Sequence, residues 1–246
     1  MSNSTLVSYT KLSPNHSGKR NHKIDTVSIH CMAGNLSVET CGNLFANKER
    51  QASSNYGIGS DGRIALYVDE ANRSWCTSSA SNDHRAITIE VANNGGAEKG
   101  WPVSDKAYEA LINLLVDICK RNGIKQLLWK GDKSLIGQVE KQNMTVHRWF
   151  ANKACPGDWL YSRHSEIAQK VNERLNPEKE EDMAVIYKTL SDVPASYHPA
   201  IQKLMEKRAL NGYSNPDPNR LDDNILNISE DMCRVFTILN ALGKLD

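Results

Sequence analysis

The sequence predicts an α/β fold with a mixed central β-sheet flanked by helices, followed by a small, mainly helical C-terminal domain. In the first 175 residues, short β-branched or alternating runs interleave with amphipathic helical patterns, as in a sheet covered by helices. A charged, proline-containing stretch then follows, and beyond it the pattern is helical. The chain has 246 residues, 39% of them hydrophobic and 24% charged, so it is long enough for one medium and one small domain.

The first elements are two strand patterns with a helix between them. Residues 25–31 alternate in polarity and predict a short strand that ends near His30. Ser37 is a suitable N-cap for a helix over 38–50, and one face of this helix is apolar. Residues 56–58 and 63–68 flank a glycine-rich sequence, GSDG, which predicts a tight turn between two strands. The apolar helix face comprises Val38, Cys41, Leu44 and Phe45.

A central strand and two helices complete the first domain. Residues 86–91 are β-branched and predict an interior strand. Ser104 caps the clearest helix pattern, which ends at Gly123. A last helix is expected over 163–175. The apolar stripe of the long helix comprises Tyr108, Leu111, Ile112, Leu115, Ile118 and Cys119.

These patterns divide the chain into a domain at 1–176, a linker at 177–183 and a helical module at 184–246. The linker lacks apolar periodicity, although a solvated extension of the preceding helix would have the same composition. Two amphipathic helices are expected in the module, one ending at Gly212 and one following Ser229. Their apolar faces comprise Ile201, Leu204 and Met205 in the first helix, and Met232, Val235, Phe236, Leu239 and Leu242 in the second.

Composition favours a protein that is made and kept in a cytoplasm. The formal net charge is +1, which gives no reason to expect nucleic-acid binding. The N-terminal sequence lacks the charged start and apolar core of a secretory signal, and no apolar run is long enough to insert into a membrane. Six cysteines without a CxxC pair indicate reduced thiols.

Three side chains have the chemistry of a zinc site. His147 and Cys155 lie eight residues apart, and His30 ends the first strand pattern. Imidazole and thiolate are ligands that zinc prefers, and three protein ligands leave a tetrahedral position for water. The sequence therefore predicts one Zn²⁺ bound by His30, His147 and Cys155. Cys31 is expected to point to the opposite face of the strand.

Four ordered segments, SIHCMAG, SSNYGIGSDGRIALYV, NDHRAITIEVAN and HRWFANKACPGDW, resemble the zinc-dependent N-acetylmuramoyl-L-alanine amidases of the phage lysozyme and peptidoglycan-recognition-protein type. The resemblance implies that Lys153 stabilises the oxyanion and that Tyr56 donates a hydrogen bond to the water or the substrate. It also implies that Glu90 is a general base or supports the ligands. The implied reaction is hydrolysis of the amide between N-acetylmuramic acid and L-alanine in peptidoglycan.

Substrate contacts are expected from Trp75, His84 and Asn94. Many relatives have Trp-His where this chain has Trp75-Cys76, so His84 is a candidate to compensate for the missing histidine. Two rival functions remain open. One is a metal-free cysteine hydrolase that uses Cys155 and His147, and the other is a non-catalytic peptidoglycan receptor.

The C-terminal sequence resembles the surface-layer-homology-like modules that end many endolysins of phages infecting Gram-positive hosts. The resemblance implies binding to the cell wall, through peptidoglycan or a secondary wall polymer. A role in self-association is the alternative. Together these features predict a phage endolysin or an autolysin, which is made in the cytoplasm and reaches the wall when the cell lyses.

Overall fold

The computed structural model describes residues 2–176, 186–207, 209–210 and 228–245, which form two compact units divided between Pro177 and Glu178. The predicted linker at 177–183 and the predicted helix end at Gly212 lie outside the described residues.

The strands are β1 (Tyr9–Thr10), β2 (His16–Lys19), β3 (Thr26–Cys31), β4 (Tyr56–Ile58), β5 (Ile64–Leu66), β6 (Asn72–Ser74), β7 (Ala86–Val91), β8 (Met144–Thr145), β9 (Ile186–Tyr187) and β10 (Ile228–Ser229). The α-helices are α1 (Val38–Ala46), α2 (Ala80–Arg85), α3 (Asp105–Asn122), α4 (Asp158–Ser162), α5 (His164–Leu175), α6 (His198–Glu206) and α7 (Glu230–Ala241), and the 3₁₀ helices are η1 (Lys48–Arg50), η2 (Ala97–Lys99), η3 (Lys133–Leu135), η4 (His147–Trp149), η5 (Leu190–Asp192) and η6 (Ala195–Tyr197).

The first unit is built on a mixed sheet, as the sequence predicts. Within the described residues its strand order is β1-β5-β4-β7-β3-β8. β7 lies inside the sheet and is parallel to both β3 and β4, whereas β4 and β5 are antiparallel. The predicted interior position of residues 86–91 is therefore confirmed, and β2 and β6 form a separate pair.

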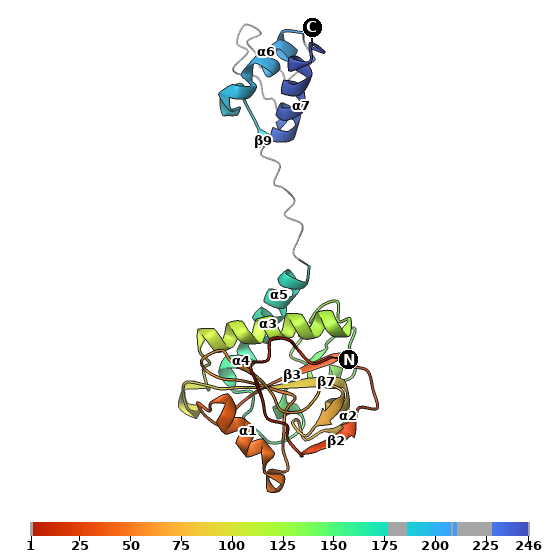
Figure 1. Cartoon of the computed structure of the whole chain (residues 1–246), viewed down its shortest axis with the longest axis vertical. Helices are drawn as coiled ribbons and strands as arrows, with labels where there is room; N and C mark the ends of the chain where they lie inside the picture. The colour runs from red at the N-terminus through yellow and green to blue at the C-terminus, as the bar shows by residue number, and fades with distance from the viewer. Residues whose placement is uncertain (1, 177–185, 208, 211–227, 246) are drawn as a thin grey trace. The chain divides into compact units, whose positions relative to one another are not determined.

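Helices cover both faces of this sheet (Figure 1). α3 and α5 lie on one side, where their apolar side chains pack with those of β3, β4 and β7 into the larger core. α1 lies on the other side and forms a smaller core with Met32, Tyr67 and Ala92. At full burial, each Leu or Ile side chain in these cores contributes about 1.5–3 kcal/mol.

The helix ends follow the predicted caps. The Ser37 and Ser104 side chains accept hydrogen bonds from the backbone of Thr40 and Ala107, and Gly123 has the left-handed φ of 68° that ends α3. In α1, Leu44 is 41% exposed, although the sequence assigns it to the apolar face. Gly42 takes the buried position instead, because the helix approaches the sheet closely there.

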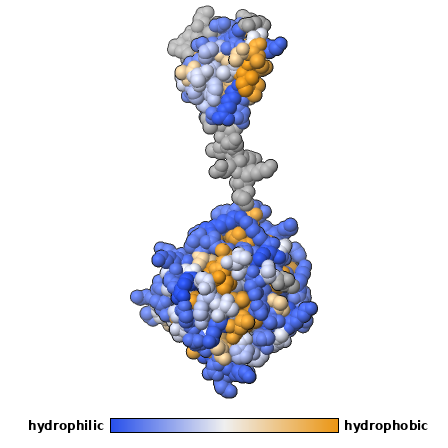
Figure 2. All heavy atoms as spheres, in the orientation of Figure 1, coloured by the Kyte–Doolittle hydropathy of each residue, from blue (hydrophilic) through white to orange (hydrophobic). Residues whose placement is uncertain are grey.

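The second unit contains α6 and α7 and the short β9–β10 pair. α6 buries Ile201, Leu204 and Met205, which confirms its predicted apolar face. In α7 the prediction is wrong for part of the face, because Cys233 is the buried residue. Met232, Val235 and Leu242 are 43%, 52% and 65% exposed, and Ile238 is 60% exposed. Figure 2 shows this unit's apolar surface gathered on one side, over α7.

None of the helices in the described ranges combines the length and the hydropathy required to cross a bilayer.

Candidate metal and substrate site

The sheet register brings His30 and Glu90 together. The two residues are paired across β3 and β7, so their side chains leave the same face of the sheet. Nδ1 of His30 lies 4.0 Å from Oε1 of Glu90. The His30 ring is fully buried, whereas the Glu90 side chain is 16% exposed.

His147 and Cys155 are presented by one loop that Arg148 closes. The loop leaves β8 through η4, and the Arg148 backbone N–H donates to the Cys155 carbonyl at 3.1 Å. The Arg148 guanidinium also donates to the Ala154 carbonyl at 2.6 Å and pairs with Asp158 at 3.0 Å. These contacts fix the separation of the two candidate ligands.

The three predicted ligands converge. Nδ1 of His30 lies 3.2 Å from Sγ of Cys155, and the rings of His30 and His147 have centroids 5.2 Å apart. One ligand atom from each of the three residues lies within 4.8 Å of the others. Nε2 of His147 also contacts the Ser78 hydroxyl at 3.1 Å. A second group in the described chain, His30, Cys76 and Glu90, meets the same distance limit.

Burial sets the protonation of these groups. Burial, with the neighbouring His147, lowers the pKa of His30 well below its usual value, and burial together with Lys153 lowers the pKa of His147. Both rings are therefore neutral near pH 7, which is the form that binds a metal. Burial raises the pKa of Glu90 well above its usual value. Such a carboxyl group is able to accept and release a proton near neutral pH.

A cavity of about 600 Å³ opens beside these residues. His147, Cys155 and Glu90 line it, and Lys153 and Trp75 stand in its wall as well. The remaining wall contains apolar side chains from α1 and from the residues before it, two arginines and one aspartate. The lining includes Leu36, Leu44, Phe45, Arg50, Arg73 and Asp83.

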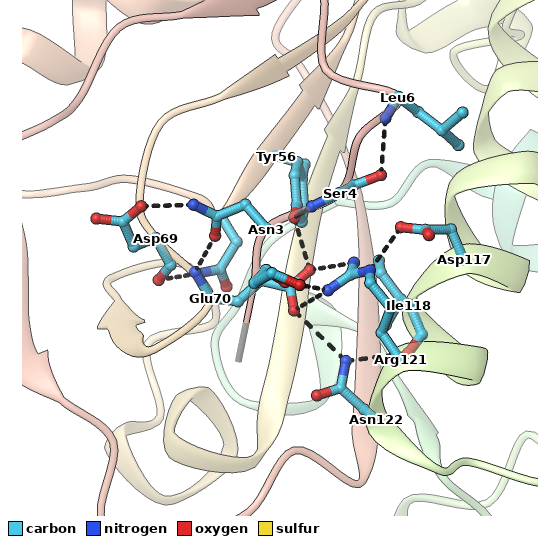
Figure 3. Close-up of polar contacts among 12 residues, drawn as sticks. Asn3, Ser4, Leu6, Tyr56, Asp69, Glu70, Asp117, Ile118, Arg121 and Asn122 are labelled. Carbon is cyan, nitrogen blue, oxygen red and sulfur yellow. Dashed lines mark hydrogen bonds and ion pairs between the residues drawn. The ribbon is translucent and has the colours of Figure 1, made fainter.

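Tyr56 does not face this cavity, which contradicts the prediction for this residue. Gly57, not Tyr56, pairs with Glu90 across β4 and β7, so the Tyr56 side chain leaves the opposite face of the sheet. Its hydroxyl donates to Oε1 of Glu70 at 2.6 Å and accepts from the backbone N–H of Ser4 at 2.9 Å (Figure 3). On the site face the Tyr67 ring lies so close to Gly57 that a Cβ there would be 2.3 Å from it.

Of the three residues predicted to contact the substrate, only Trp75 lines the cavity. Its indole N–H donates to the Ser17 hydroxyl at 2.7 Å. His84 and Asn94 do not line the cavity, so the structure does not bring these two residues into it. His84 lies in α2 and accepts from the Asn21 backbone N–H at 3.2 Å, and Asn94 is exposed beyond the end of β7.

Cys31 is nearer to the site than the sequence suggests. Its position next to His30 predicts that it points to the opposite face, and it does pack against the larger core there, but it also borders the cavity. Its thiol shares a hydrogen bond with that of Cys155, which lowers the pKa of Cys31 and raises that of Cys155. Cys31 is still paired with Val91 in the register of β3 and β7, so it shares the face of Val27 and Ile29.

Several site residues carry no sequence signal. Ser28, Ser78 and Arg148 contact the candidate ligands, and Arg50 and Arg73 stand in the cavity wall. The sequence indicates a position near the site for Ser28 alone, because Ser28 lies two residues before His30 in β3 and so shares its face.

Comparison with known proteins gives a family match and several similar structures. Residues 20–158 match the family model described as N-acetylmuramoyl-L-alanine amidase. A mutant endolysin from Bacillus subtilis is 16% identical, with a TM-score of 0.49, covering 67% of this chain and 99% of that one. The amidase LysC from Clostridium intestinale URNW is 17% identical, with a TM-score of 0.48 and coverage of 67% and 97%. The Drosophila peptidoglycan recognition protein SD is 18% identical, with a TM-score of 0.46 and coverage of 63% and 92%. A search of curated proteins found no match.

Proposed function

Because this chain belongs to the N-acetylmuramoyl-L-alanine amidase family, we propose that it is a zinc-dependent hydrolase of bacterial peptidoglycan. The bond cleaved is the amide between the lactyl group of N-acetylmuramic acid and L-alanine of the stem peptide. The observation that carries the proposal is the convergence of His30, His147 and Cys155 beside a cavity that also contains Lys153 and Glu90.

The donor set fits zinc. Two neutral imidazoles and a thiol that a metal would deprotonate form a three-ligand set of the kind found in catalytic zinc sites. When bound, zinc supplies a Lewis acid and lowers the pKa of a coordinated water towards neutrality.

The remaining roles belong to side chains in the cavity wall. Glu90 is placed to accept a proton from the attacking water, since its pKa is raised by burial, and to deliver that proton to the departing L-alanine amine. The Lys153 ammonium stabilises the negative charge that develops on the carbonyl oxygen. The products are a free lactyl carboxylate and a free peptide amine.

The cationic wall favours an acidic stem peptide. Arg50 and Arg73 line the cavity, and no described residue hydrogen-bonds to Nε of Arg73. The nearby Asp83 carboxylate accepts from the backbone of Cys76 and Thr77 and from the Thr77 hydroxyl instead. We therefore propose that the two arginines bind the free carboxylates of the stem peptide.

A metal-removal experiment tests the reaction. Full-length protein dialysed against a strong chelator is expected to lose hydrolysis of purified peptidoglycan, and added zinc to restore it. The products should show new L-alanine amino termini without new reducing sugar ends. His147→Ala should abolish the activity, whereas His84→Ala, outside the cavity, serves as the matched control and should retain it.

Other outcomes would point to the rival functions. Full activity in metal-free protein would favour a cysteine hydrolase with Cys155 as nucleophile. Binding to peptidoglycan with neither product formed, in zinc-loaded protein, would favour a receptor.

For the second unit, we propose wall binding without a chemical role. This unit is small and contains a pair of helices, as an appended binding module does. The exposed apolar side chains of α7 form a surface that a partner could cover. Self-association through the same surface is the second candidate, favoured by the exposure of Val235, Ile238 and Leu242.

A further inference from the structure

The buried nitrogen of His30 that faces away from the other ligands has a single hydrogen-bonding neighbour among the described residues. Nε2 lies 3.1 Å from the hydroxyl of Ser28, and both side chains are fully buried. The other ring nitrogen, Nδ1, faces Cys155 at 3.2 Å and Glu90 at 4.0 Å. A metal shared with Cys155 would therefore use Nδ1.

The Ser28 hydroxyl has a second neighbour that can only accept. Its oxygen lies 3.2 Å from the backbone carbonyl of Thr145, the residue paired with Ser28 across β3 and β8. A serine hydroxyl has one proton. If that proton goes to the Thr145 carbonyl, the serine oxygen must accept from Nε2–H. The reverse arrangement would leave the ring proton on Nδ1, where it would block the lone pair that faces Cys155.

We propose that Ser28 is a positioning residue that holds the proton of His30 on Nε2 and so presents the Nδ1 lone pair to zinc. The relay runs from Nε2–H to the Ser28 hydroxyl and on to the Thr145 carbonyl. Metal-binding histidines commonly donate their second N–H to a fixed acceptor, and removing such an acceptor typically lowers metal affinity about 10–100-fold. The inference rests on the proposed function, because it assumes that His30 binds zinc.

Zinc titration of the metal-free, full-length chain provides the test. Ser28→Ala is expected to raise the zinc Kd roughly 10–100-fold. Thr145→Val is the matched control, because it lies on the paired strand and its buried hydroxyl has no hydrogen-bond partner in the described structure. This variant keeps the backbone carbonyl and should bind zinc as the wild type does. An unchanged Kd in Ser28→Ala, or an equal loss in both variants, would overturn the inference.

A spectroscopic measurement on the wild type is independent of any folding defect in the variants. ¹⁵N spectra of the metal-free, histidine-labelled chain should place the His30 proton on Nε2, and a proton on Nδ1 would refute the proposed relay. Thermal melts of the metal-free variants should show that both fold. If the wild type itself fails to bind zinc, the proposed function fails, whereas normal wild-type binding with an insensitive Ser28→Ala overturns only the role of Ser28.

Discussion

At the residue scale, the site depends on a few groups whose protonation is controlled by burial. His30 and His147 are kept neutral, and the Glu90 carboxyl is kept ready to hold a proton. Oε2 of Glu90 is buried and has no hydrogen-bond partner within the described chain. A carboxylate in that position is costly unless it takes part in binding or chemistry.

Glu90→Gln keeps the shape of this side chain and removes its ability to take a proton. We expect kcat to fall about 10²–10⁴-fold, because general base catalysis contributes that much in comparable enzymes. Zinc affinity should remain close to that of the wild type. Steady-state kinetics on peptidoglycan fragments and zinc titration measure the two effects. Glu98→Gln, an exposed change in η2, is the control, and equal rates in Glu90→Gln and wild type would exclude the role of Glu90 as base.

His164 gives a pH-dependent prediction. Burial lowers its pKa to about 4 from an ordinary value of 6.5, so the unfolded chain binds the proton more readily than the folded one. Its contribution therefore makes stability fall as pH drops from 6.5 towards 4, by at most about 1.4 kcal/mol per pH unit. In His164→Phe, urea unfolding of the metal-free protein should show a shallower loss over this range. A slope identical to that of the wild type would contradict the assignment.

At the element scale, α3 is tied to the strands by a buried network on the face opposite the candidate site (Figure 3). Glu70 is fully buried and receives two hydrogen bonds from Arg121 of α3, at 2.6 and 2.7 Å, and one from the Tyr56 hydroxyl. Arg121 also donates to the Ser2 carbonyl and so holds the N-terminal segment. Tyr56 thus stabilises the sheet on which the site is built.

Glu70→Gln should destabilise the fold by roughly 3 kcal/mol, because it leaves the Arg121 charge in a largely buried position without its main partner. Asp117→Asn is the matched control, since it removes the other carboxylate of Arg121 on the more exposed side of the network. There we expect about 1 kcal/mol or less. Urea midpoints measure both, and equal losses would show that burial of Glu70 does not dominate. Activity per folded molecule should be unchanged in each variant.

At the scale of the whole molecule, we propose a different role for each unit, hydrolysis for the first and wall binding for the second. The first unit contains the candidate site, and the second has its own small core around Tyr187, Ile201 and Cys233. The surplus of basic residues lies in residues 1–175, whereas residues 176–246 are net acidic. Net charge would therefore attract an anionic polymer to the first unit and not to the second.

A fragment comprising residues 1–176 is expected to cleave soluble muropeptides at the full-length rate and to bind intact walls more weakly. Two linked binding units give avidity that is typically 10²-fold or more above either unit alone, so a loss on the order of 10² is expected. Co-sedimentation with purified walls and turnover of the soluble substrate separate the two effects. Undiminished wall binding by the fragment would contradict a wall-binding role for the second unit.

The sequence by itself determined the elements whose signals are local. The caps at Ser37 and Ser104, the β-branched run of β7 and the stripe of α3 all indicate the correct element. Residue type and spacing also indicate three metal-ligand candidates, which converge in the structure. Only the tertiary structure decided which side chains share a face and a cavity. The pairing of Gly57 with Glu90 turned Tyr56 away from the site, and the packing of α6 selected Cys233 of α7 for burial. The physical reason is that strand register and helix rotation are set by partners distant in the chain, and a shift of one residue reverses the face that a strand side chain occupies.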